Sequence, residues 1–127
     1  MNSVSTAAGT HLLADCHGVA VELLRDAKTL ERLLRDAARH AGAHVLSSHF
    51  HTFGDRDGVT GVVLLSESHV SIHTWPETAF AAIDVFMCGS AEPKRAIAEL
   101  TRVLAPQHLE VREVTRPSAY LKFGQPD

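Results

Sequence analysis

The sequence predicts an α+β fold, a two-layer sandwich in which an antiparallel-rich β-sheet carries two helices on one face. Short connections join most neighbouring strand-like segments, which favours antiparallel pairing. Only residues 23–41 and 93–105 repeat apolar side chains at helical spacing. With 127 residues, the chain is expected to form one domain, residues 1–127.

The first two predicted elements are a strand over residues 11–19 and a helix over residues 23–41. Glycines bound the strand, and the nine residues that open the chain are small and polar and are expected to be disordered. In the helical segment, leucine and alanine recur at intervals of three and four with charges between them, and Gly42 follows as a stop signal. The segment therefore predicts an amphipathic helix lying on the sheet.

The middle of the chain predicts four strands in succession. They cover residues 43–53, 59–66, 69–75 and 79–88. The glycine- and aspartate-rich residues 54–58 predict a loop after the first of these strands, and Glu67-Ser68 is interpreted as the turn before the third. Pro93 then favours the start of the second helix, residues 93–105, and residues 109–115 predict a last strand.

The strand after the turn should have two chemically different faces, because successive side chains alternate. One face would carry His69, Ser71 and His73, and the other Val70, Ile72 and Thr74. A serine that follows a carboxylate at a tight turn, with histidines a few residues on, has the groups for attack on a neighbouring carbonyl with assisted proton transfer. The same pattern also fits a hairpin with a polar outer face.

Composition narrows the classes of partner. The chain has 12 Lys and Arg against 15 Asp and Glu, so there is no basic surplus to bind nucleic acid or an anionic membrane. It has neither a run of about 20 apolar residues nor the pattern of a signal peptide. A small-molecule partner and a cytoplasmic location are expected, and Cys16 and Cys88 are interpreted as thiols.

Residues 67–77, ESHVSIHTWPE, resemble the self-cleavage segment of the short prokaryotic S-adenosylmethionine decarboxylases, the pyruvoyl-dependent proenzymes of spermidine biosynthesis. Residues 11–18, 50–53 and 84–89 are similar to other segments of that family, so the resemblance covers roughly residues 10–116. It implies a fold of paired αβ half-sandwiches, a homodimer with its active sites near the junction.

The resemblance also implies roles in self-cleavage and catalysis. Cleavage would fall between Glu67 and Ser68, giving a β chain of residues 1–67 and an α chain of residues 68–127. Ser68 would become the covalently bound pyruvoyl group, a pyruvate-derived cofactor that holds the substrate as a Schiff base and accepts electrons during decarboxylation. His73 would handle protons during processing, Thr60 stands where the family usually has a helping serine, and Cys88 would return a proton to the substrate carbon.

For the substrate, the resemblance implies that Glu77 binds the ribose hydroxyls and that Phe53, and less directly Phe50, contact adenine and the sulfonium. Asp15 is a further candidate acid. Cys16 has only the interpretation of a buried strand thiol.

Other readings stay open. Some proteins with the same pyruvoyl motif decarboxylate arginine or ornithine instead, and the segment Asp15-Cys16-His17 departs from the family, where many members have Glu, Leu and Tyr. A homologue that does not process itself could serve as a regulatory partner. The pairs His49 with His51 and His69 with His73 resemble zinc ligands, although no metal is expected because neither cysteine belongs to a CxxC-like pair. Pyridoxal phosphate would need a Schiff-base lysine in a phosphate cradle, and none of the three lysines has that setting.

Overall fold

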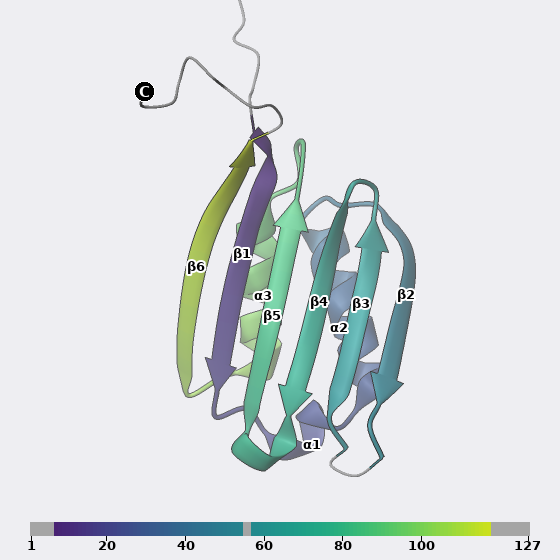
Figure 1. Cartoon of the computed structure of the whole chain (residues 1–127), viewed down its shortest axis with the longest axis vertical. Helices are drawn as coiled ribbons and strands as arrows, with labels where there is room; N and C mark the ends of the chain where they lie inside the picture. The colour runs from purple at the N-terminus through teal and green to yellow at the C-terminus, as the bar shows by residue number, and fades with distance from the viewer. Residues whose placement is uncertain (1–6, 55–56, 118–127) are drawn as a thin grey trace, which may run out of the picture.

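The computed structural model describes residues 7–54 and 57–117, which form a single six-stranded antiparallel sheet with its α-helices on one face (Figure 1). The elements are β1 (Ala7–His17), α1 (Val21–Leu24), α2 (Ala27–His40), β2 (Val45–Thr52), β3 (Val59–Leu65), β4 (Ser68–Trp75), the 3₁₀ helix η1 (Pro76–Thr78), β5 (Phe80–Met87), α3 (Pro93–Leu104) and β6 (His108–Pro117). The predicted α+β class is confirmed. Within the described residues, no helix is long and apolar enough to cross a membrane.

The strand order is β2-β3-β4-β5-β1-β6, and all the pairs are antiparallel. Strands β2 to β5 follow one another as a meander, whereas β1 lies between β5 and β6. The hydrophobic core fills the space between the sheet and helices α2 and α3. Its largest fully buried side chains include Leu12, Leu24, Leu30, Leu34, Ile72, Ile83, Met87, Leu100 and Leu104. The described residues place no helix on the opposite face of the sheet (Figure 1).

The prediction of one helix over residues 23–41 is wrong, because the segment forms two helices, α1 and α2. Asp26 breaks the segment: its carboxylate accepts a hydrogen bond from the backbone N–H of Thr29 at 3.1 Å and so caps the start of α2. Leu24 is fully buried in the short α1, so the apolar spacing continues across the break. The described residues therefore hold three α-helices instead of the predicted two.

The hairpin between β3 and β4 turns one residue earlier than the sequence suggested. Leu65 pairs with Ser68, which leaves Ser66 and Glu67 as the two turn residues. Ser68 is thus the first residue of β4, not part of the turn. The predicted alternation of β4 is confirmed, since Val70 and Ile72 are buried and face the helices.

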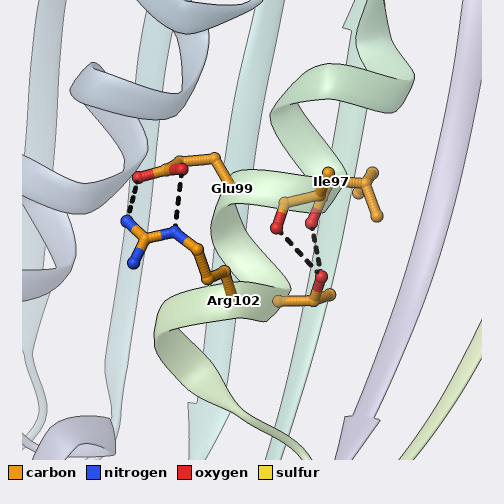
Figure 2. A network of polar contacts seen from close by, with 5 residues as sticks. Ile97, Glu99 and Arg102 are labelled. Carbon is orange, nitrogen blue, oxygen red and sulfur yellow. Dashed lines mark hydrogen bonds and ion pairs between the residues drawn. The ribbon is translucent and has the colours of Figure 1, made fainter.

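Helix α3 packs its apolar stripe on the sheet and carries its polar contacts along its own turns (Figure 2). Arg102 donates two hydrogen bonds to the Glu99 carboxylate, at 3.2 and 2.7 Å, and these lower the pKa of Glu99. The Thr101 hydroxyl donates to the carbonyl of Ile97 at 2.8 Å. Glu99, Thr101 and Arg102 thus bond within the helix, whereas Lys94 at its start pairs with Glu113 of β6 at 3.8 Å.

Among the described residues, Thr74 is the buried polar residue of the core, and only 6% of it is exposed. Its hydroxyl donates to the carbonyl of Leu24 at 2.8 Å and accepts from the backbone N–H of Val59 at 2.8 Å, so it ties α1 and β3 to β4. Thr74→Val keeps the shape but leaves both backbone groups unpaired. We expect unfolding in urea to show a loss of about 2 to 4 kcal/mol. Thr78→Val, at an exposed position, is the matched control and should change stability little.

Candidate active site

The predicted cleavage site lies at the end of the sheet where β4 begins, beside the end of β5. The register pairs His69 with Phe86, and continuing it outward by two residues places Glu67 opposite Cys88. The Cys88 thiol donates a hydrogen bond to the carbonyl oxygen of Glu67 at 3.1 Å. A donor on this oxygen polarises the carbonyl and would stabilise negative charge on it during nucleophilic attack. No local sequence pattern indicates this contact, because the two residues are 21 positions apart.

Two backbone features shape this end of the site. Glu67 has a φ of 66°, in the left-handed region that costs a non-glycine residue of order 1 to 3 kcal/mol. Strain is therefore stored directly before the bond expected to break. Gly9 of β1 lies against this region: a Cβ there would collide with the carbonyl oxygen of Met87 and lie 3.1 Å from the Cys88 sulfur. A side chain at position 9 would displace the thiol from Glu67.

A second cluster lies at the opposite end of β4. Thr60 and His73 are cross-strand partners, and the Thr60 hydroxyl is 3.2 Å from Nδ1 of His73. The two residues share a pocket of about 490 Å³. Its lining consists of Phe53, Gly54, Gly58, Thr60, His73, Thr74, Trp75 and Glu77. The pocket thus brings together residues with four predicted roles. They are the helper Thr60, the proton-handling His73, the aromatic Phe53 and the carboxylate of Glu77.

The structure does not bring Ser68 and His73 together within one chain. They are the first and sixth residues of β4, so they lie about 16 Å apart at the 3.3 Å rise of a strand. Figure 1 shows β4 running from the hairpin with β3 at one end of the sheet to η1 at the other. The predicted site is therefore divided into a cleavage-site cluster (Glu67, Ser68 and Cys88) and a binding cluster (Phe53, Thr60, His73, Trp75 and Glu77).

The family model for S-adenosylmethionine decarboxylase matches residues 10–117, nearly all of the described chain. The chain belongs to the S-adenosylmethionine decarboxylase family. The S-adenosylmethionine decarboxylase proenzyme of Persephonella marina is 44% identical over 109 residues, covering 85% of this chain and 81% of that protein. The proenzyme of Pelotomaculum thermopropionicum is 42% identical over 118 residues, covering 90% and 93%.

A solved structure in the same family has the same fold. The adenosylmethionine decarboxylase of Aquifex aeolicus superposes with a TM-score of 0.81 at 33% identity, covering 98% of this chain and all of that chain. The resemblance inferred from residues 67–77 is therefore confirmed at the level of family and fold.

Two of the predicted site residues lie outside both clusters. Phe50 packs its ring over Gly61, where any Cβ would collide with it, and joins the partly buried side chains around the core. Asp15 lies on β1, with its carboxylate 3.7 Å from Nη2 of Arg112. Phe50 also lines a second pocket together with Thr60 and His73, so its contact with the substrate stays a prediction, as does the acid role of Asp15.

Sequence reasoning missed Trp75 as a site residue. Its ring is 40% exposed, lies 5.4 Å from that of Phe80 and lines the pocket with Phe53. A signal was available, because Trp75 is the only tryptophan and lies two residues after His73, on the same face of the strand. The alternative interpretation as a zinc site finds no support among the described residues. No three metal-ligating side chains in this part of the chain come close enough to hold an ion.

Proposed function

We propose that this protein cleaves itself between Glu67 and Ser68 and then decarboxylates S-adenosylmethionine to form the aminopropyl donor for spermidine biosynthesis. The observation that carries the proposal is the hydrogen bond from the Cys88 thiol to the carbonyl of Glu67, in a family that includes the proenzymes of Persephonella marina and Pelotomaculum thermopropionicum. That carbonyl is the group Ser68 must attack. The intact mass of purified protein, followed by release of carbon dioxide from S-adenosylmethionine, tests the proposal.

Cleavage requires the Ser68 hydroxyl to attack the Glu67 carbonyl carbon, and the resulting ester to undergo elimination. Cys88 is placed to donate to the carbonyl oxygen in the first step. Once formed from Ser68, a pyruvoyl group supplies the electron sink that decarboxylation needs. The Cys88 thiol would then lie beside that group, placed to give a proton to the substrate carbon. Both roles need a free thiol, which fits the proposed cytoplasmic location.

We further propose a homodimer in which each active site uses both subunits. Support comes from the separation of the two clusters along β4, by about 16 Å, and from the sheet face that no helix of the described residues covers (Figure 1). A two-fold axis makes contacts reciprocal, so the cleavage-site cluster of one subunit could meet the binding cluster of its partner in both directions. Ser68 would then be processed with His73 of the partner subunit.

Phe53 is expected to bind the adenine ring, because its exposed ring faces a pocket that also contains Trp75 and the Glu77 carboxylate. Phe53→Ala should weaken substrate binding by about 1 to 3 kcal/mol, the range for stacking of a base on an aromatic ring. Self-cleavage should remain intact. Titration of S-adenosylmethionine by calorimetry checks the affinity, with Leu46→Ala as control, since Leu46 is exposed on β2, the strand that Phe53 directly follows, and lies outside the pocket. Unchanged affinity in Phe53→Ala would contradict the assignment.

The alternative substrates, arginine and ornithine, have no adenine for an aromatic pocket to bind. The relatives compared above are named for S-adenosylmethionine and give these alternatives no support. Parallel assays of carbon dioxide release from the three compounds decide between them. Retention of Ser68, His73 and Cys88 likewise argues against a regulatory homologue that has lost the chemistry.

A further inference from the structure

His51, near the end of β2, is an exposed residue that the proposed function does not use. The pairing of β2 with β3 sets His51 opposite Thr60, and Thr60 in turn lies opposite His73 on β4. Residues that are opposite each other on neighbouring strands project from the same face of a sheet, so the three side chains form a row across it. His51 therefore lies on the face of the sheet that carries Thr60 and His73 of the binding cluster.

The imidazole of His51 contacts the ring of Phe53. The two ring centroids are 4.7 Å apart and the ring planes meet at 78°, which is an edge-to-face arrangement. Aromatic rings prefer this geometry because the positive edge of one ring meets the negative face of the other. The two residues are two positions apart, the spacing at which side chains of an extended segment fall on one side. The contact therefore favours one orientation of the Phe53 ring.

Phe53 depends on such a neighbour, because half of the residue is exposed. Its backbone is held on both sides: its N–H donates to the carbonyl of Gly58 at 2.8 Å, and its carbonyl accepts from the N–H of Asp57 at 2.9 Å. These bonds place the backbone but do not fix the side-chain torsions. A ring that must be ordered when a ligand binds costs free energy at that moment, and a ring that is held beforehand costs less.

His51 and Phe53 belong to two adjacent pockets. Phe53 lines the pocket of about 490 Å³, whereas His51 lines the second pocket, of about 350 Å³. Thr60 and His73 line both, so the pockets meet at this pair. Among the described residues, His51 is not part of the lining of the first pocket. Its influence on a ligand seated there is therefore exerted through the Phe53 ring.

We propose that His51 is a positioning residue for substrate binding, which holds the Phe53 ring in the orientation that stacks on adenine. The inference deepens the proposed function and rests on it. The imidazole acts as a packing partner and takes no part in bond making, so another aromatic ring should replace it. Its loss should weaken substrate binding and leave turnover and self-cleavage unchanged.

The first test compares His51→Ala with His51→Phe, which keeps a ring able to make the edge-to-face contact. Assays of carbon dioxide release from S-adenosylmethionine should show a KM raised about two- to tenfold in His51→Ala with an unchanged kcat, and a KM near the wild-type value in His51→Phe. His40→Ala removes an exposed histidine of α2 and is the control. An unchanged KM in His51→Ala, or failure of His51→Phe to restore it, overturns the inference. A wild type that releases no carbon dioxide from S-adenosylmethionine overturns the proposed function instead.

Trp75 gives a direct readout of binding, because it is the only tryptophan in the chain and lines the pocket with Phe53. Titration with 5′-methylthioadenosine, which has the adenine and the ribose but no carboxylate to lose, should quench its fluorescence. The Kd should rise about two- to tenfold in His51→Ala. In a Phe53→Ala background the same substitution should have no further effect, because the ring that His51 positions is gone. An equal effect in both backgrounds overturns the inference.

Self-cleavage separates this role from one in the row that His51 forms with Thr60 and His73. Newly made His51→Ala, followed in a cell-free translation reaction with radiolabelled methionine, should cleave itself at the wild-type rate. Slower cleavage with an unchanged KM would show that His51 acts on Thr60 and His73 rather than on Phe53, and would overturn the inference.

Discussion

Ser68→Ala is expected to leave a single uncleaved chain and to abolish decarboxylation. Alanine has no nucleophile to attack the Glu67 carbonyl, and no pyruvoyl group can form without the Ser68 oxygen. The loss should be complete in both assays, since the cleavage product is itself the electron sink. Denaturing electrophoresis and intact mass check cleavage, and release of labelled carbon dioxide checks activity. In the wild type, the fragment that begins at residue 68 should be blocked to N-terminal sequencing.

The matched control is Ser66→Ala, in the same two-residue turn. It removes a hydroxyl of the same kind next to Glu67, but the nucleophile and the Cys88 contact remain. This variant should process normally. Clean processing of Ser68→Ala, or failure of both variants alike, would contradict the assignment of Ser68 as the attacking residue.

Two inactive variants should restore each other when they are produced together. If each site combines Ser68 of one subunit with His73 of its partner, Ser68→Ala chains supply the intact histidine and His73→Asn chains supply the intact serine. A mixed dimer then has one complete site and one site lacking both groups. With random pairing, roughly a quarter of all sites should be complete. A dimer of either variant alone has no complete site.

Co-expression of the two variants with different tags, followed by tandem purification and mass analysis, checks this prediction. Cleavage should be confined to the chain that carries His73→Asn. Co-expression of two differently tagged copies of the same variant is the control and should give no cleavage. Absence of cleavage in the purified mixed dimer would show that Ser68 and His73 of one chain act together, which would contradict the shared site.

Much of the fold followed from local patterns. The six strands and the final helix appeared in the predicted order because alternation and helical spacing are properties of neighbouring residues. The break between α1 and α2 was missed because Leu24 continues the apolar spacing while the Asp26 cap interrupts the backbone. The turn was displaced by one residue because its position depends on which residues of β3 and β4 pair.

The sequence alone determined the family, the α+β class and the chemical groups concentrated in residues 67–77. These are encoded within short segments, where residue type and spacing are enough. Tertiary structure decided which of those groups meet. The register of β4 on β5 places Cys88 on the Glu67 carbonyl, the length of β4 separates Ser68 from His73, and the pairing of β2 with β3 places the Phe50 ring over Gly61. The physical reason is that strand register and burial depend on contacts between residues far apart in the chain, which no local pattern specifies.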